Sequence, residues 1–482
     1  MSGATLARRL ENVRATGARI GAATPATQLA RRDRTDDAQR LATAVGGNVV
    51  ATEAGVIVHY EGPPRTLRVD RERLATLPGQ PPADVPLVCL DTETTGLGTA
   101  AGTVAFLVGL GWWERDVFRQ VQLILPDHSD EPALLDAIEA LIPADAWLVT
   151  YNGRSFDWPL LVARFRLARR EPPRHAGHLD LLPVARLLFR HRTGDARLKT
   201  IESALLGVTR HDDVEGWQIP GLYLDFLRGG PAGPIAEIVR HNDEDVRSLA
   251  RLLALLDTDY GDPVARSSAP EGDLAGLAAA FRRQRRLEEA LGCLDAAVSR
   301  PRPVPTRPVL RWDDHGVRLD PSTSVADRGR IEAERARLLR RLGRHHDAAA
   351  AWLAISTVGG ALAVRSHIEL AKIHEHVDRD PVRALQAADR AHRLLDGVSP
   401  ALLQDPLRRD LERRRRRLRR RVDPGTHGPP DRLEHRRLVT VQRVLADDRH
   451  PAAGELYGPD PARGDGARLV EGPLQHERRR DR

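Results

Sequence analysis

The sequence predicts an α/β domain, with a mixed β-sheet flanked by helices, followed by an α-helical hairpin-repeat region. Two observations carry this expectation. Over residues 87–257, three strand-like runs give way to helices that alternate with further strands, which indicates a mixed sheet. Over residues 270–400, the composition changes to Ala, Leu, Arg and Glu at helical spacing. A chain of 482 residues is long enough for two or three domains.

The segment before the α/β domain divides into two parts. Residues 1–45 are rich in Arg, Ala and Thr without a sustained period, so we expect them to be mobile or partly helical. Residues 46–86 form a hairpin and a linker: two β-branched runs surround the turn-like TEAG, and the proline-rich LPGQPPADVP leads into the next strand.

Hydrophobic patterning places the elements of the α/β domain. The strand-like runs are VPLVCLD, GTVAFLVGLGWW, FRQVQLIL and AWLVTYN. The helix-like runs are EPALLDAIEALI, SFDWPLLVARFRLA and PIAEIVRHNDEDVRSLARLLALL. Active sites usually lie at the carboxyl ends of such strands, so polar residues there are the candidates for chemistry.

The region after residue 270 contains three similar stretches, RRLEEALGCLDAA, GRHHDAAAAWLAI and DRDPVRALQAADRA. Ala290, Ala348 and Ala384 hold matching places in them, where a small residue lets paired helices pack closely, as in a tetratricopeptide-like array. The spacings of 58 and 36 residues are irregular, so an ordinary helical bundle is the alternative. For residues 401–482 we expect a basic helix, LRRDLERRRRRLRRR, followed by a disordered tail.

Composition excludes several classes of protein. Two cysteines cannot form a disulfide framework or a Cys-based zinc site, and they fit a reducing cytoplasm. No uncharged run approaches the ~20 residues that cross a bilayer, and no signal peptide is evident, so we expect a cytoplasmic protein without membrane contact. The net charge of +7 permits a polyanionic partner without requiring one.

Three acidic elements carry the candidate chemistry. Asp91 and Glu93 end a strand two residues apart, so both side chains point to the same side. Asp157 lies about one turn into the helix after the strand AWLVTYN. Asp245 follows His241 by four residues and shares its helical face. An isolated pair such as Asp91 and Glu93 is better explained by solvation or capping, but the ordered set favours a cation site.

These residues suit hard divalent cations. Four carboxylates without a cysteine are typical ligands of Mg²⁺ or Mn²⁺. Two such ions, roughly 3.5–4 Å apart, activate water and stabilise the leaving oxygen in phosphodiester cleavage. The sequence therefore predicts a site for two metal ions.

The motifs LDTETTGL, YNGRSFDWP and HNDEDV resemble the three exonuclease motifs of the DEDD branch of the ribonuclease-H-like superfamily. With HLDLLPVAR and LKTIESALLG between them, they are most similar to the YprB-type ribonuclease-H-like proteins, which also carry tetratricopeptide-like helices after the nuclease domain. The resemblance implies a ribonuclease-H-like sheet, 3′–5′ exonuclease activity on DNA or RNA, and metal binding by Asp91, Glu93, Asp157 and Asp245.

His241 departs from the family pattern. It stands where the tyrosine of a Y-x3-D motif would stand, whereas the histidine-type subclass places four residues between His and Asp. An imidazole titrates near neutrality, so His241 is a candidate to orient or deprotonate the attacking water. The alternative is a helix histidine without a catalytic role. Asp243 and Glu244 lie in the same helix but face away from this side.

Four residues are candidates for substrate contact. Thr94 and the neighbouring backbone amides would approach a terminal nucleotide, Asn152 and Gly153 line the next strand exit, and Lys199 would meet a phosphate. Asn-Gly is also a plain turn signal, and a solvated lysine is the alternative for Lys199.

Two further groups of residues receive other interpretations. His175, His178 and Asp180 are interpreted as structural. The runs Arg413–Arg417 and Arg419–Arg421 either bind phosphates electrostatically or form a solvated face.

Two other functions stay open from the sequence: a nucleic-acid-binding protein that does not cut, and a scaffold whose helical repeats bind a protein partner.

Overall fold

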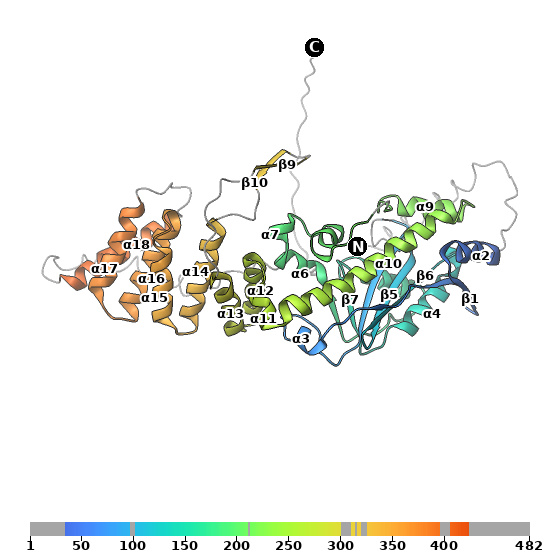
Figure 1. The fold of residues 1–482 in the computed structure, drawn as a ribbon, viewed down its shortest axis with the longest axis horizontal. Helices are drawn as coiled ribbons and strands as arrows, with labels where there is room; N and C mark the ends of the chain where they lie inside the picture. Colours follow the sequence, from blue (N-terminus) through green and yellow to red (C-terminus); the bar gives the residue numbers. More distant parts are fainter. Residues whose placement is uncertain are drawn as a thin grey trace, which may run out of the picture. The chain divides into compact units, whose positions relative to one another are not determined.

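The structure is a computed structural model that describes residues 34–96, 102–210, 213–299, 310–313, 316–319, 325–395 and 405–423. The chain divides into two compact units, Met1–Leu418 and Arg419–Arg482. The first unit holds the β-sheet, its helices and most of the helical region (Figure 1). The tail that the sequence predicts to be disordered lies outside the described residues from 424 onward.

An eight-stranded mixed sheet runs in the order β1-β2-β6-β5-β4-β7-β8, with β3 beside β6. Its strands are β1 (Asn48–Thr52), β2 (Gly55–Glu61), β3 (Arg65–Thr66), β4 (Leu87–Thr94), β5 (Ala105–Glu114), β6 (Val117–Ile124), β7 (Trp147–Thr150) and β8 (Gly177–Asp180). β4 pairs antiparallel with β5 and parallel with β7, and β7 pairs parallel with β8. The predicted mixed sheet is confirmed, and β1 and β2 form the hairpin expected around TEAG.

β4 is covered on both faces, which explains its continuous apolar run. Leu87 and Cys89 belong to one buried cluster, and Val88 and Leu90 belong to another. Strands buried on both faces lack the usual alternation of apolar and polar residues. The strand becomes half-buried from Asp91 onward, so its carboxylates lie where the hydrophobic cover ends.

Helices flank the sheet on both sides. They are α2 (Arg34–Val45), α3 (Arg71–Ala75), α4 (Glu131–Leu141), α5 (Asp157–Leu167), α6 (Leu181–Leu188), α7 (Arg190–Thr193), α8 (Leu198–Ile201), α9 (Ile219–Leu227), α10 (Gly233–Leu255) and α11 (Pro263–Ser267), with the short turns η1 (His128–Asp130), η2 (Glu202–Leu206) and η3 (Leu256–Gly261). The long helix α10 packs against β4, β5 and β6. This contact places its middle turns beside the polar end of β4.

Helix α2 fits the partly helical alternative for the end of the first segment. Ala38, Leu41 and Ala42 are fully buried, and the Arg40 guanidinium donates to the carbonyl oxygen of Gly230 at 2.7 Å. Apolar residues at helical spacing form one narrow face, which the Arg- and Thr-rich composition concealed. Residues 1–33 lie outside the described residues.

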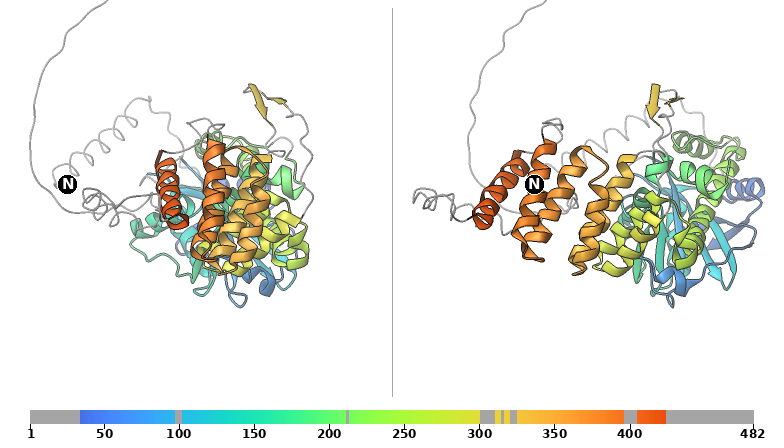
Figure 2. Two further views of the ribbon diagram at one scale, coloured as in Figure 1. Left: turned by 90° about the vertical axis from the view of Figure 1, so that its left-hand side faces the viewer. Right: turned by 60° about the vertical axis from the view of Figure 1, so that its left-hand side comes forward.

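The helical region consists of successive antiparallel neighbours (Figure 2). Its helices are α12 (Glu271–Arg283), α13 (Leu287–Ser299), α14 (Val325–Arg341), α15 (His345–Ile355), α16 (Gly360–His376), α17 (Pro381–Leu395) and α18 (Asp405–Val422). They pair as α12 with α13, α14 with α15, and α16 with α17. The strands β9 (Leu310–Asp313) and β10 (Gly316–Leu319) lie between the first two pairs, which accounts for the longer first spacing.

The three pairs repeat one detail of backbone and burial. Ala290, Ala348 and Ala384 are all fully buried. Five residues before each of them, Arg285, Gly343 and Arg379 have positive φ angles. A left-handed residue ends the first helix of each pair and turns the chain into the second. The helices therefore pair as hairpins of one design; their assignment to the tetratricopeptide class stays a prediction.

The sheet and the helical region share a continuous core that extends to Leu418. At the junction, the fully buried carboxylate of Asp273 accepts hydrogen bonds from Arg192 at 2.8 Å and from the Tyr260 hydroxyl at 2.5 Å. His191 Nε2 lies 2.6 Å from the same carboxylate. Within the described parts of the chain, no helix has both the length and the apolar character needed to span a membrane.

Candidate active site

The end of β4 presents two carboxylates to helix α10. Asp91 accepts a hydrogen bond at 2.7 Å from the side-chain amide of Asn242, which is completely buried in α10. In the sheet, Asp91 lies opposite Gly109 of β5, and a Cβ atom on Gly109 would overlap the Asn242 side-chain oxygen. The absence of a side chain at position 109 therefore makes room for the amide that orients Asp91.

The third carboxylate comes from the start of α5. Asp157 is the first residue of that helix, and its Oδ1 accepts a hydrogen bond at 2.5 Å from the hydroxyl of Thr92. Thr92 lies between Asp91 and Glu93 in β4, so its hydroxyl holds Asp157 beside the pair. Thr92 was not predicted to have this function.

Helix α10 contributes His241 and Asp245, one turn apart on one face. His241 Nε2 lies 3.8 Å from Glu93 Oε1 and 3.6 Å from Asp245 Oδ2. Ligand atoms of these three residues all lie within 4.8 Å of one another, a spacing that fits one metal ion. The structure thus brings His241 to the predicted carboxylates.

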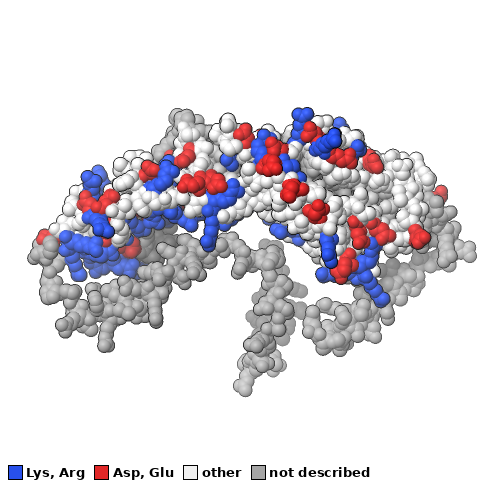
Figure 3. Space-filling view, turned by 90° about the horizontal axis from the view of Figure 1, so that it is seen from below, with Lys and Arg blue, Asp and Glu red and all other residues white. Residues whose placement is uncertain are grey.

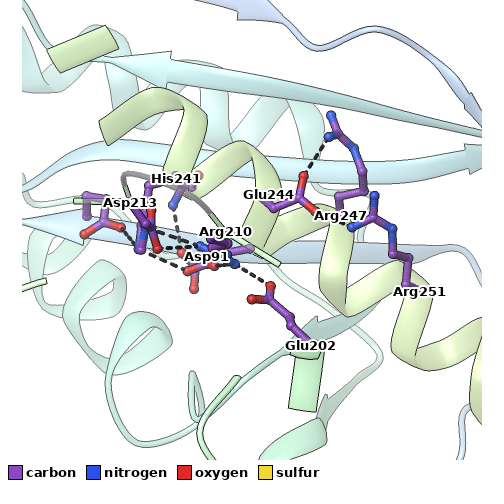
Figure 4. Close-up of polar contacts among 11 residues, drawn as sticks. Asp91, Glu202, Arg210, Asp213, His241, Glu244, Arg247 and Arg251 are labelled. Carbon is purple, nitrogen blue, oxygen red and sulfur yellow. Dashed lines mark hydrogen bonds and ion pairs between the residues drawn. The ribbon is translucent and has the colours of Figure 1, made fainter. Parts of the chain in front are cut away.

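A second carboxylate orients the imidazole of His241. Nδ1 lies 2.7 Å from Asp213 Oδ1 and 3.2 Å from the Arg210 guanidinium (Figure 4). The closer Asp213 carboxylate is an acceptor, so Nδ1 donates its proton there and Nε2 keeps its lone pair toward Glu93 and Asp245. Metal-binding and catalytic histidines are commonly oriented by such a carboxylate.

Arg210 places a fixed positive charge among the carboxylates. Its guanidinium bonds to both Asp245 and Glu202, and only 8% of its side chain is exposed (Figure 4). Glu202 begins η2, a turn of π-helix, and its side chain is 1% exposed. Single π-turns in helices are frequent at functional sites. Arg210 therefore neutralises part of the negative charge that Asp245 and Glu202 bring together.

Sequence reasoning missed several of these groups. Asn242 had a signal, because it lies three residues before Asp245 on the same turn of helix as the predicted acid. Glu202 lies in the quoted stretch LKTIESALLG but was given no role. Arg210 and Asp213 lie outside helices and strands, where no periodicity indicates which way a side chain points.

Electrostatics favours a cation at this site. Burial raises the pKa of Asp91 and Glu93 well above the ordinary range; the charges of Asp245 and Asp157 raise it further, while Arg210 lowers it. Burial also raises the pKa of Asp157 and Asp245. Carboxylates that cannot all ionise together become favourable once a divalent cation lies among them. The donor set, oxygen atoms with one imidazole, fits Mg²⁺ or Mn²⁺.

A cavity of about 260 Å³ adjoins the carboxylates. Its lining combines the polar residues Thr92, Glu93, Thr94 and Asp157 with the apolar residues Phe156, Leu160, Ile219 and Pro220. Phe156 is 49% exposed, so part of this aromatic residue is open to solvent beside the carboxylates. The cavity thus joins carboxylates to a surface on which a planar group can stack.

The residues predicted to contact substrate differ in their surroundings. Thr94 lines the cavity, although its hydroxyl donates to the carbonyl oxygen of Gly96 at 2.6 Å. Asn152 has a left-handed backbone, and its N–H donates to Asp180 at 2.8 Å. Gly153 packs tightly against Thr150. The contacts of Asn152 and Gly153 are those of a turn.

Lys199 is exposed on α8, and its substrate role stays a prediction.

Three neighbouring residues have structural contacts, as the sequence indicated. His178 Nε2 lies 2.9 Å from the Thr150 hydroxyl, and Asp180 caps α6 by accepting from the Leu182 N–H at 3.0 Å. His175 Nδ1 lies 3.1 Å from its neighbour's backbone carbonyl oxygen.

Asp243 and Glu244 point away from the site, as expected. Asp243 pairs with Arg247 at 2.6 Å, and Glu244 pairs with Arg247 at 2.9 Å and with Arg251 (Figure 4).

Known proteins resemble the chain over this whole region. The family model of the RNase_H superfamily matches residues 88–257, which include Asp91, Glu93, Asp157 and Asp245. The chain is also similar to YprB of Bacillus subtilis (strain 168), an uncharacterized protein, with 30% identity over 309 residues, which are 63% of this chain and 68% of YprB.

Proposed function

The chain belongs to the YprB-type family of the ribonuclease H superfamily, and from this premise we propose that it is a metal-dependent nuclease, a 3′–5′ exonuclease acting on DNA or RNA. The observation that carries the proposal is the convergence of Glu93, His241 and Asp245 within 4.8 Å, next to Asp91 and Asp157. Structural ion pairs do not explain this cluster, because its carboxylates outnumber the nearby positive charges and burial disfavours their ionisation.

Asp91, Glu93, Asp157 and Asp245 would hold two ions, Mg²⁺ or Mn²⁺. When bound, such ions supply activation of water and neutralise the charge that develops on the leaving oxygen. Side chains of the protein would orient the reacting groups and bind the end of the strand.

Neighbouring groups orient the reacting ones. The Asn242 amide and the Thr92 hydroxyl hold Asp91 and Asp157 in position. The Nδ1–H of His241 donates a hydrogen bond to Asp213, so Nε2 stays toward the carboxylates, where it would accept a proton from water or orient the water.

The adjoining cavity accommodates the end of a strand. Its apolar lining residues, among them the partly exposed Phe156, offer a stacking surface for a terminal base, whichever base that is. Glu93 and Asp157 also line the cavity, so a base stacked there would bring its terminal phosphodiester beside the carboxylates.

The test is a time course of the purified full-length protein with Mn²⁺ on single-stranded DNA and RNA, labelled at the 5′ end in one series and at the 3′ end in another. We expect a ladder that shortens from the 3′ end, that EDTA stops, and that Asp91→Ala and Asp157→Ala abolish. Asp136→Asn is the matched control, since this aspartate lies on the surface of α4 with a half-exposed side chain. Cleavage by Asp91→Ala at the wild-type rate contradicts the proposal.

A folded protein that binds both nucleic acids but leaves them intact would favour the non-cutting alternative. Internal cleavage of a circular strand would instead assign an endonuclease and contradict the exonuclease polarity.

A further inference from the structure

Helix α18 carries a concentration of positive charge. Its 18 residues contain ten arginines and three carboxylates, a net charge of +7, which equals the formal net charge of the whole chain. The rest of the chain is therefore balanced in charge. A charge run of this kind is either used within the fold or offered to a partner, and the structure separates these two uses.

Part of the arginine run holds α18 in place. Arg414 and Arg417 both bond to Glu375 of α16, whose side chain is only 1% exposed. Arg415 bonds to Asp389 of α17 at 2.7 Å. These three arginines neutralise carboxylates of the fold. The sequence left phosphate binding and a solvated face open for Arg413–Arg417, and these three arginines are instead paired with carboxylates of the same chain.

A second set of arginines lies on the opposite side of the helix. The inner side consists of Leu407, Leu411 and Arg414. Arg409, Arg413 and Arg416 each follow one of these residues by two positions, which is a rotation of about 200° around the helix axis. All three are exposed. We name Arg409, Arg413 and Arg416 the outer arginine row.

The arginines of the outer row form few ion pairs within the described part of the chain. Within the described residues, Arg413 has only a 3.6 Å contact with Asp410 of the same helix, and neither Arg409 nor Arg416 forms an ion pair. Figure 3 shows Lys and Arg side chains gathered at the end of the molecule where α17 and α18 lie, at the left of the view. The positive charge of the row is thus available to a partner.

The residues of α18 fit a nucleic acid better than a membrane surface. A helix that binds a membrane surface needs an exposed apolar face, but Leu411 and Leu418 of α18 are buried against other helices. The row spans about 10 Å along the helix, and one strand of B-form DNA carries about three phosphates over that axial length. No aromatic residue occurs in α18, so base stacking has no platform there.

We propose that the outer arginine row is a second contact for nucleic acid, which binds the phosphate backbone independently of sequence and away from the carboxylate site. The choice of nucleic acid as the polyanion rests on the proposed function, because a nuclease site on the same chain requires such a partner. The row then retains a long strand while its end is in the carboxylate site.

The experiment measures binding without cleavage. Full-length Asp91→Ala protein is titrated against fluorescently labelled single-stranded DNA, single-stranded RNA and duplex DNA at several salt concentrations. In that background, Arg409, Arg413 and Arg416 are changed together to Gln. The control changes three other exposed arginines to Gln, namely Arg68, Arg166 and Arg228.

We expect weaker binding and a shallower dependence of affinity on salt for the outer-row variant. The slope of log K against log salt is negative, and the loss of three phosphate contacts reduces its magnitude by about 2 for single strands and by about 3 for duplex. Changing the same residues to Lys should restore most of the slope, because the charge returns, whereas the control should keep the parental slope. An unchanged melting temperature verifies that α18 stays folded.

The outcomes separate this proposal from the nuclease assignment. An unchanged salt slope in the outer-row variant overturns the second contact, even if the wild-type protein cleaves. Row-dependent binding together with a wild-type protein that does not cleave supports the second contact and contradicts the nuclease assignment. Row-dependent binding to phosphatidylserine vesicles or to polyglutamate, with no effect on nucleic acid, overturns the proposal in favour of a membrane or a protein partner.

Discussion

Replacing Arg210 by Gln tests whether its guanidinium and a divalent cation stabilise the same carboxylates. In the structure, Arg210 bonds to Asp245 and Glu202, and their side chains are 8%, 17% and 1% exposed. Breaking a buried ion pair by removal of one partner costs about 3–5 kcal/mol. Burial raises the pKa of Asp245, so proton uptake offsets part of this loss, and we expect about 3 kcal/mol in EDTA.

A divalent cation should restore much of that loss. If Arg210 opposes a cation beside Asp245, its removal tightens cation binding, and a tenfold tighter Kd corresponds to about 1.4 kcal/mol. At saturating Mn²⁺ the variant therefore gains about 1.4 kcal/mol more stabilisation than the wild type, since stabilisation follows RT ln(1 + [L]/Kd). Urea unfolding in EDTA and in Mn²⁺ measures both quantities, and isothermal titration with Mn²⁺ measures Kd directly.

The control for this prediction is Arg251→Gln. Arg251 pairs with Glu244 on the outer side of α10, and its side chain is 31% exposed, so we expect a loss below about 1 kcal/mol and an unchanged response to Mn²⁺. Equal Mn²⁺ stabilisation of the wild type and of Arg210→Gln would refute the shared site. Full stability of Arg210→Gln in EDTA would refute the structural function of the guanidinium.

Three further outcomes follow from the same geometry. Gly109→Ala places a Cβ atom against Asn242, so we expect the free energy of unfolding in urea to fall by about 1–3 kcal/mol. We also expect cleavage to be about 10–100-fold slower, because Asn242 orients Asp91. Wild-type values of both stability and cleavage rate would contradict this. Without metal, the pKa of Asp91 in the folded protein lies above its ordinary value of 3.8, so the stabilisation from protonated Asp91 is complete below about pH 4 and is lost as pH rises through the raised pKa. Unfolding in EDTA across this pH range should show a decline in the free energy of unfolding, and Asp91→Asn should make that decline smaller. Asp273→Ala leaves Arg192 without its buried partner, and we expect about 3 kcal/mol lower stability by denaturant unfolding; a loss below 1 kcal/mol would contradict the junction described here.

Local patterns in the sequence were sufficient for the elements and for part of the site. Apolar runs and helical periods predicted the strands β4 to β7 and the helices α4, α5 and α10, because burial of a face repeats with the geometry of each element. The two-residue period of a strand placed Asp91 and Glu93 on one side, and the helical turn placed His241 beside Asp245.

The tertiary structure decided how charged groups are used. Arg210 contacts Asp245, 35 residues away, and Arg417 contacts Glu375, 42 residues away. No local period encodes such pairs, since a charged side chain is attracted to whatever opposite charge the folded backbone brings near. The sequence by itself therefore determined the sheet, the helices and the acidic motifs, which depend on burial along the chain. Only the folded arrangement decided that Arg210 enters the carboxylate cluster and that the basic helix divides into an inner, neutralised side and an outer, available one, because these depend on distances through space.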